Sequence, residues 1–157
     1  MRRARTCAIV VAFGVLALCT PLLGARPAQA GSKIAAAGVI SVVSNVPDSV
    51  KQAGRTTITQ ATAVVTFDGT LNGPATEIYT QVEPPNGSVR QHGKGFFDGT
   101  IAGRTGMLEY VFHGGATGGQ IVVTNGTGGL RGVHGTLRYA FEAATGVFTY
   151  EGTLRLQ

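Results

Sequence analysis

Cysteine and tryptophan are the residues that this sequence most lacks. Its 157 residues include no tryptophan and two cysteines, Cys7 and Cys19. Both cysteines lie in the first thirty residues, a segment that we expect to be removed. The remaining chain then has no disulfide, no cysteine nucleophile and no thiolate metal site. Its stability has to come from a packed core.

The first thirty residues have the features of a signal peptide. Three arginines before residue 6 are followed by an apolar run over 8–18 and by the small-x-small sequence Ala-Gln-Ala at 28–30. The apolar run is too short to span a bilayer comfortably. We therefore expect a signal peptide over 1–30, a single domain over 31–157, and a secreted protein with no membrane segment after cleavage.

Basic charge is also scarce once the leader is set aside. The whole chain has a formal net charge of +5, but four of its thirteen Lys and Arg residues lie in the leader. Nine basic residues then face eight acidic ones, which leaves a net charge of +1. Binding to nucleic acid depends on a strongly basic surface. We therefore expect no nucleic-acid partner.

Helical patterns are missing as well. No long segment keeps apolar residues at i, i+3, i+4 and i+7, and 22 of the 24 glycines lie outside the leader. Short β-rich runs recur instead, separated by turn sequences such as Pro-Pro-Asn-Gly at 84–87. We expect a loop or one helical turn at 45–54. The eight strands predicted cover 38–44, 55–67, 75–83, 88–97, 107–113, 120–124, 135–142 and 147–156.

Many short strands without helices to cover a sheet favour closure, because closing a sheet removes its exposed edges. The sequence therefore predicts an all-β fold, an eight-stranded antiparallel up-and-down barrel, with a flattened sandwich as the alternative. The sequence Phe-Asp-Gly-Thr occurs at 67–70 and again at 97–100, as expected for bends in a meander. A barrel of eight strands is either filled by side chains or holds one small ligand.

Glycine is densest at 125–137, between two predicted strands. A phosphate-binding loop is one interpretation. However, the Gly-Lys-Ser/Thr ending of a P-loop is missing, and a strand follows where a helix N-terminus would hold the anion. We therefore expect a structural bend here.

Four polar residues on predicted strands are the candidate catalytic residues. Glu77 and Tyr79 share one strand face, and Glu109 and His113 share another. If these side chains point into a closed lumen, burial would raise the pKa of the carboxyl groups and make them useful proton donors. If they point outward, they are ordinary solvated residues.

Motifs for other chemistries are missing. The three histidines are far apart in sequence, with no His-x-His or His-Glu-x-x-His. Glu109 and His113 would be about 13 Å apart along a strand, too far to share a metal easily. No serine lies in Gly-x-Ser-x-Gly. We therefore expect no metal, no cofactor and no serine-hydrolase activity.

Several glycine-rich segments together resemble a known family. They are Thr-Phe-Asp-Gly-Thr-Leu-Asn-Gly at 66–73, the segment 97–106, His-Gly at 113–114, and Gly-Thr-Gly-Gly-Leu-Arg-Gly-Val-His-Gly at 126–135. Their order is similar to that of small bacterial proteins of unknown function that are related to allene oxide cyclases and, more distantly, to plant dirigent proteins. The resemblance implies a calycin-like eight-stranded barrel.

The resemblance also implies an activity. Allene oxide cyclases and dirigent proteins steer reactive hydrophobic substrates to one stereoisomer without a cofactor, largely by holding them in shape. Related barrels often associate, so a homo-oligomer is an open alternative to a monomer. We therefore expect a barrel that binds a small hydrophobic molecule as a cofactor-free cyclase or isomerase. The alternative is a non-catalytic secreted module for ligand binding or surface interaction.

Overall fold

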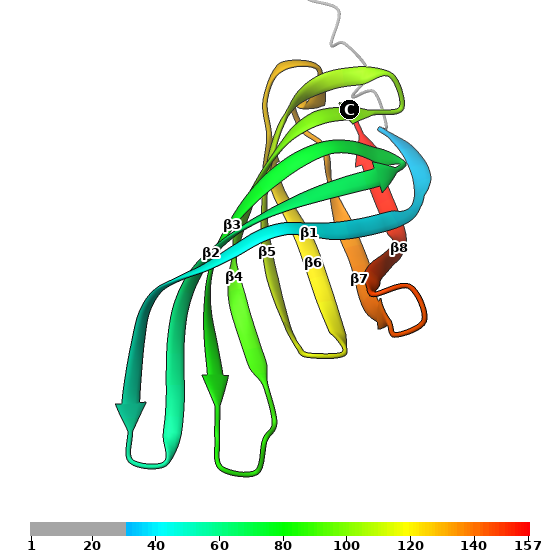
Figure 1. Ribbon diagram of the computed structural model, residues 1–157. Coiled ribbons are helices and arrows are strands. Elements are labelled where there is room, and N and C mark those ends of the chain that lie inside the picture. Colours follow the sequence, from blue (N-terminus) through cyan, green and yellow to red (C-terminus); the bar gives the residue numbers. More distant parts are fainter. Residues whose placement is uncertain (1–30) are drawn as a thin grey trace, which may run out of the picture.

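The computed structural model describes residues 31–157, which form one closed barrel of eight antiparallel strands in sequence order (Figure 1). Each strand pairs with the next, and β8 pairs with β1. The predicted all-β barrel is confirmed. The strands are β1 (Ser32–Ala53), β2 (Thr56–Gly69), β3 (Leu71–Glu83), β4 (Arg90–Ile101), β5 (Arg104–Gly115), β6 (Gly118–Gly126), β7 (His134–Glu142) and β8 (Val147–Leu156).

The predicted signal peptide at 1–30 lies outside the described residues. Within 31–157, no helix is both long and apolar enough to cross a membrane.

Alternation along the strands separates an inner from an outer face. In β8 the even positions Tyr150, Leu154 and Leu156 are buried, and the odd positions Thr149, Glu151 and Arg155 are exposed. The even positions of β8 therefore form its inner face.

In β3 the inner face carries polar as well as apolar side chains. Leu71, Ala75 and Tyr79 are buried and Ile78 is exposed. Because side chains alternate along a strand, Glu77 shares the inner face with Ala75 and Tyr79.

Strand β1 differs from the expectation for 45–54, because it continues as strand to Ala53. Two bulges interrupt its pairing with β2, between Val42 and Ser44 and between Pro47 and Ser49. A bulge accommodates an extra residue and increases the local twist. Beyond Ile40, β1 no longer pairs with β8. Pro47 is tolerated because it lies at a bulge on this free edge.

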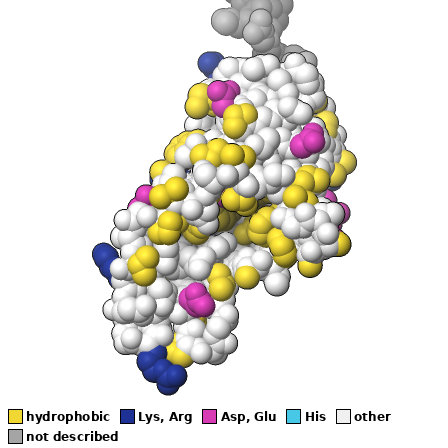
Figure 2. All heavy atoms as spheres, viewed as in Figure 1, with side chains coloured by type: hydrophobic (Ala, Val, Ile, Leu, Met, Phe, Trp, Pro, Cys, Tyr) yellow, Lys and Arg dark blue, Asp and Glu magenta, His cyan; other side chains and the backbone are white. Residues whose placement is uncertain are grey.

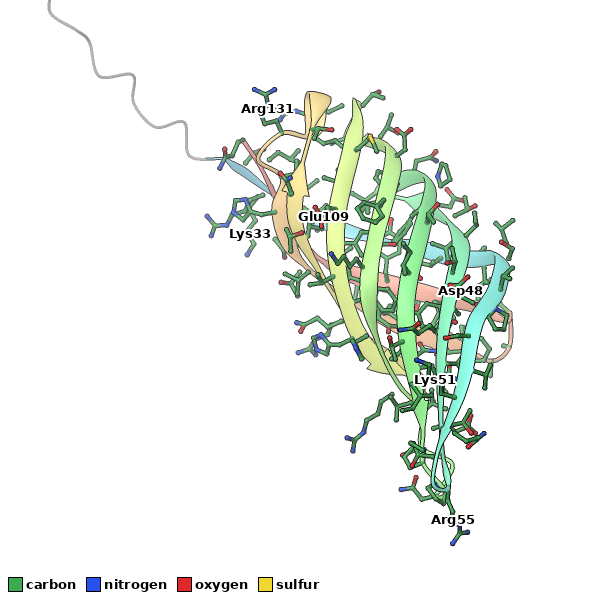
Figure 3. All side chains as sticks on the ribbon, turned by 90° about the vertical axis from the view of Figure 1, so that its left-hand side faces the viewer. Lys33, Asp48, Lys51, Arg55, Glu109 and Arg131 are labelled. Carbon is green, nitrogen blue, oxygen red and sulfur yellow. The ribbon has the colours of Figure 1, made fainter. Side chains whose placement is uncertain are left out.

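The departure of β1 from β8 gives the barrel one open side. The β1–β2 and β3–β4 hairpins project beyond the β5–β6 and β7–β8 turns (Figure 1). Asp48, Lys51 and Arg55 mark the projecting β1–β2 hairpin, far from Lys33 and Arg131 at the other end of the molecule (Figure 3).

The stretch at 125–137 forms the bend between β6 and β7. It contains the 3-10 turn η1 (Gly128–Leu130). Leu130 and Val133 on either side of Arg131 are almost completely buried, whereas Arg131 is exposed. The bend therefore supplies apolar side chains to the core.

The repeated Phe-Asp-Gly-Thr sequence has a packing role. Phe67 and Phe97 are buried, and their rings meet edge to face with centroids 5.8 Å apart. The glycine two residues later, Gly69 or Gly99, lies against the backbone of a neighbouring strand, where a Cβ atom would collide. The two copies thus place equivalent aromatic rings in the core.

Candidate functional site

A cavity of about 170 Å³ lies inside the barrel, next to the opening where β1 leaves β8. Figure 2 shows a hollow rimmed by apolar side chains on this side of the molecule. An apolar cavity of about 150 Å³ is large enough for benzene, so this one has room for a ring-sized group. Its walls are formed by Ile40, Val42, Asn45, Ala63, Val65, Glu77, Tyr79, Gln91, Phe112, Ile121, Tyr139 and Phe148.

Glu77 is the one charged residue in this wall. Its Oε1 accepts a hydrogen bond of 2.7 Å from the Tyr110 hydroxyl. The two residues lie on β3 and β5 with β4 between them, in one cross-strand row with Gly95. A Cβ atom at residue 95 would collide with the Tyr110 ring. Glycine at this position therefore lets the tyrosine reach across β4.

The second carboxyl oxygen of Glu77 remains accessible. Among residues 31–157, no buried side-chain nitrogen or oxygen lacks a hydrogen-bond partner. The hydrogen bond from Tyr110 is made to Oε1. The Oε2 atom has no such bond within the described residues, so it must be accessible, and it belongs to a side chain in the cavity wall.

Burial changes the acidity of the groups around this carboxyl. Desolvation raises the pKa of Glu77 above its ordinary 4.5, and the hydrogen bond from Tyr110 offsets part of the rise. Desolvation, with the negative charge of Glu77, raises the pKa of Tyr110 well above 10. The same two causes raise the pKa of Tyr139 to about 12. Both phenols therefore stay protonated at neutral pH.

The other polar groups of the cavity are largely bonded to protein atoms. The Tyr79 hydroxyl exchanges hydrogen bonds with the Asn45 amide at 2.8 and 3.0 Å. Gln91 donates to Gln81 at 2.8 Å. These bonds fix the side chains on the β1, β3 and β4 side of the cavity.

Each of the four tyrosines faces a glycine on the neighbouring strand. Without a side chain opposite it, a tyrosine ring can lie along the inner surface of the sheet. At each of these glycines a Cβ atom would collide with the facing tyrosine. The pairs are Tyr79 with Gly93, Tyr110 with Gly95, Tyr139 with Gly119, and Tyr150 with Gly38.

The four predicted site residues fall on two sides of the barrel wall. Glu77 and Tyr79 line the cavity. Glu109 and His113 lie on the opposite face of β5 from Tyr110 and Phe112, and His113 is exposed. The structure therefore brings the first pair together in the cavity and leaves the second pair outside it.

Several cavity residues were not predicted from the sequence. Asn45 fell in a segment expected to be a loop or one helical turn, and Tyr110 and Phe112 were not among the candidate residues. Glycines opposite tyrosines were a usable signal, but recognising it requires the strand register. Within 31–157, no group of three or more His, Asp or Glu residues is placed to hold a metal ion.

Comparison with known proteins agrees with this architecture. A protein of unknown function from the DUF3224 family of Shewanella oneidensis MR-1 superposes with a TM-score of 0.69 at 19% identity, covering 80% of this chain and 99% of the other. The pterocarpan synthase dirigent protein GePTS1 superposes with a TM-score of 0.52 at 15% identity, covering 94% and 99%. At these identities the likeness concerns the fold.

No curated protein matches the sequence. The family described as "Protein of unknown function (DUF3224)" matches residues 36–152, which is most of the barrel. The chain therefore belongs to the DUF3224 family.

Proposed function

We propose that this barrel binds a small, largely apolar molecule in its cavity and acts on it as a cofactor-free isomerase or cyclase. The observation that carries the proposal is Glu77, a half-buried carboxyl in an otherwise uncharged cavity wall. One of its oxygens is held by Tyr110 and the other is accessible. A fixed proton donor beside an apolar space is the arrangement that proton-transfer catalysis needs.

The chemistry needs no other reagent. The protonated Glu77 carboxyl gives its proton to one atom of the ligand, and the resulting carboxylate removes a proton from another atom. The ligand changes its bonding but not its composition, and Glu77 returns to its starting state. Tyr110 donates to Oε1 and so stabilises the carboxylate between the two transfers.

The walls supply the stereocontrol. Aromatic and aliphatic side chains from seven strands surround the cavity, and Tyr79 and Gln91 are held by hydrogen bonds. A ligand confined there reacts from a restricted set of conformations. The pterocarpan synthase GePTS1 has a similar fold, which makes a barrel of this shape compatible with synthesis.

The proposal includes export, because the sequence at 1–30 has the form of a signal peptide. A protein that leaves the cell would meet its ligand outside it.

The test begins with native mass spectrometry of the protein purified from culture medium. We expect a co-purifying small molecule. Returned to the protein in deuterated water, this molecule should gain deuterium with the wild type and not with Glu77→Gln. A retained molecule that never exchanges would support the non-catalytic carrier instead. An empty protein that takes up no apolar probe would contradict binding altogether.

A further inference from the structure

The lining of the cavity carries charge of one sign only. Among its twelve lining residues the one charged side chain is Glu77, and none is Lys or Arg. The other polar side chains are Asn45, Gln91 and the hydroxyls of Tyr79 and Tyr139. A negatively charged ligand would find no cation there and would face a carboxyl group in a partly dry site, which is unfavourable.

Aromatic rings form much of the remaining wall. Tyr79 and Phe112 have ring centroids 6.1 Å apart, and Tyr139 and Phe148 form an edge-to-face pair at 5.8 Å. The face of an aromatic ring is the negative part of its quadrupole and attracts cations within about 6 Å. A ring that turns its face to the cavity therefore favours the same sign of charge as the carboxyl group.

We propose that the natural ligand is a ring-sized molecule with a basic nitrogen, whose ammonium group pairs with Glu77 between these aromatic rings. This inference rests on the proposed binding function and names its ligand class. The volume of about 170 Å³ limits the buried part to about one ring. The accessible oxygen of Glu77 provides the acceptor for the N–H group.

The protonation state before binding does not change the bound pair. If Glu77 is ionised, an ammonium ion pairs with it directly. If Glu77 is protonated, its proton moves to the lone pair of a neutral amine, and the same ammonium–carboxylate pair results. A hydrogen bond between charged groups inside a protein is stronger than one between neutral groups.

Three probes of one ring size test the inference: benzylamine, benzyl alcohol and benzoate, titrated by calorimetry into the purified protein at neutral pH. They differ mainly in charge, as cation, neutral molecule and anion. We expect benzylamine to bind at least about tenfold more tightly than benzyl alcohol, the effect of one charge-assisted hydrogen bond. We expect benzoate to bind more weakly than either.

Two variants locate the effect. Glu77→Gln keeps an acceptor for Tyr110 and should reduce benzylamine binding to the level of benzyl alcohol. Glu109→Gln removes the same charge from the outer face of β5 and should leave the preference unchanged. In the wild type, the side-chain carboxyl signal of Glu77 should shift in NMR spectra on addition of benzylamine, and that of Glu109 should not. Because this shift is measured in the wild type, it tests the pairing with Glu77 even if Glu77→Gln fails to fold.

The outcomes separate the two proposals. If benzyl alcohol binds in the cavity as tightly as benzylamine, or benzoate binds best, the amine inference is wrong and ligand binding stands. A preference for benzylamine that survives Glu77→Gln, with no shift of the Glu77 signal, also overturns the inference. If no probe binds and the protein carries no molecule of its own, both proposals fail.

Discussion

Glu77 and Tyr110 make contact across an intervening strand because residue 95 has no side chain. Their hydrogen bond of 2.7 Å joins positions 33 residues apart in the sequence. The Tyr110 ring occupies the space that a Cβ atom at residue 95 would need. Gly95 therefore determines that the Tyr110 hydroxyl lies beside the Glu77 carboxyl group.

Gly95→Ala tests this role. The added methyl group should displace the Tyr110 ring, break its bond to Glu77 and cost about 1–3 kcal/mol, the usual penalty for overpacking a core. Urea unfolding measures the loss, and the NMR titration of the Glu77 carboxyl reports the bond. The neighbouring Lys94→Ala is the control, since Lys94 is exposed on the outer face. An unchanged titration of Glu77 in Gly95→Ala would contradict the prediction.

Glu77 also makes stability depend on pH. Burial raises its pKa above 4.5, so the folded protein binds this proton more tightly than the unfolded chain does. The contribution of Glu77 to folding is therefore fully present below pH 4.5 and is lost as the pH rises through the folded-state pKa.

Glu77→Gln should remove that dependence. Relative to the wild type, the free energy of unfolding of the variant should rise from acidic to neutral pH, because glutamine has no charged form to desolvate. Urea unfolding at a series of pH values measures the difference. Glu109→Gln, on the outer face, is the matched control. Parallel stability profiles for wild type and Glu77→Gln would refute the prediction.

At the scale of elements, the bend between β6 and β7 closes part of the core. Leu130 is completely buried in η1, next to exposed Arg131. The turn is held by backbone hydrogen bonds from Leu130 to Thr127 and from Val133 to Leu130. Local backbone geometry and core packing therefore depend on the same few residues.

Leu130→Ala should destabilise the protein by about 2–5 kcal/mol, because it removes buried methyl groups and leaves a cavity. Arg131→Ala, one residue along the same turn, should change stability by no more than about 0.5 kcal/mol. Thermal and urea unfolding compare the two. Equal effects of the two substitutions would mean that the bend does not contribute to the core in this way.

Strand β1 shows why element boundaries were harder to predict than element number. Pro47 and Asp48 have the composition of a turn, yet the chain continues as strand because a bulge at this point accommodates both. The free edge beyond Ile40 also removes the need for a donor at residue 47. Neither circumstance is visible before the pairing of β1 with β2 and β8 is known.

At the scale of the whole molecule, the barrel is closed by pairing around the ring yet open on one side. Pairing between β1 and β8 ends at Ile40 and Phe148, and both residues line the cavity. The proposed function therefore places ligand entry beside β1, where the cavity wall has no β1–β8 pairing.

The expected export of the protein can be tested separately from ligand binding. When the full-length protein is produced in a bacterium with a standard secretion system, the form in the medium should begin at Gly31, because the small-x-small sequence ends at Ala30. N-terminal sequencing and intact mass identify this end. Material that stays in the cell with Met1 in place would contradict the expected leader, while the ligand-binding experiments remain valid.

The sequence by itself determined the number of strands and the all-β class. These features are local: turn residues punctuate the chain, and period-two alternation assigns each side chain to a face. It also named Glu77 and Tyr79, but it could not separate them from Glu109 and His113, since alternation says which residues share a face and not which face is inside.

Only the tertiary structure decided what surrounds Glu77. The register of β3, β4 and β5 places Glu77, Gly95 and Tyr110 in one row. A shift of one residue would send each side chain to the other face. The early departure of β1 from β8 then opens the space beside that row. Register and closure depend on the whole sheet, so no single segment of the sequence contains them.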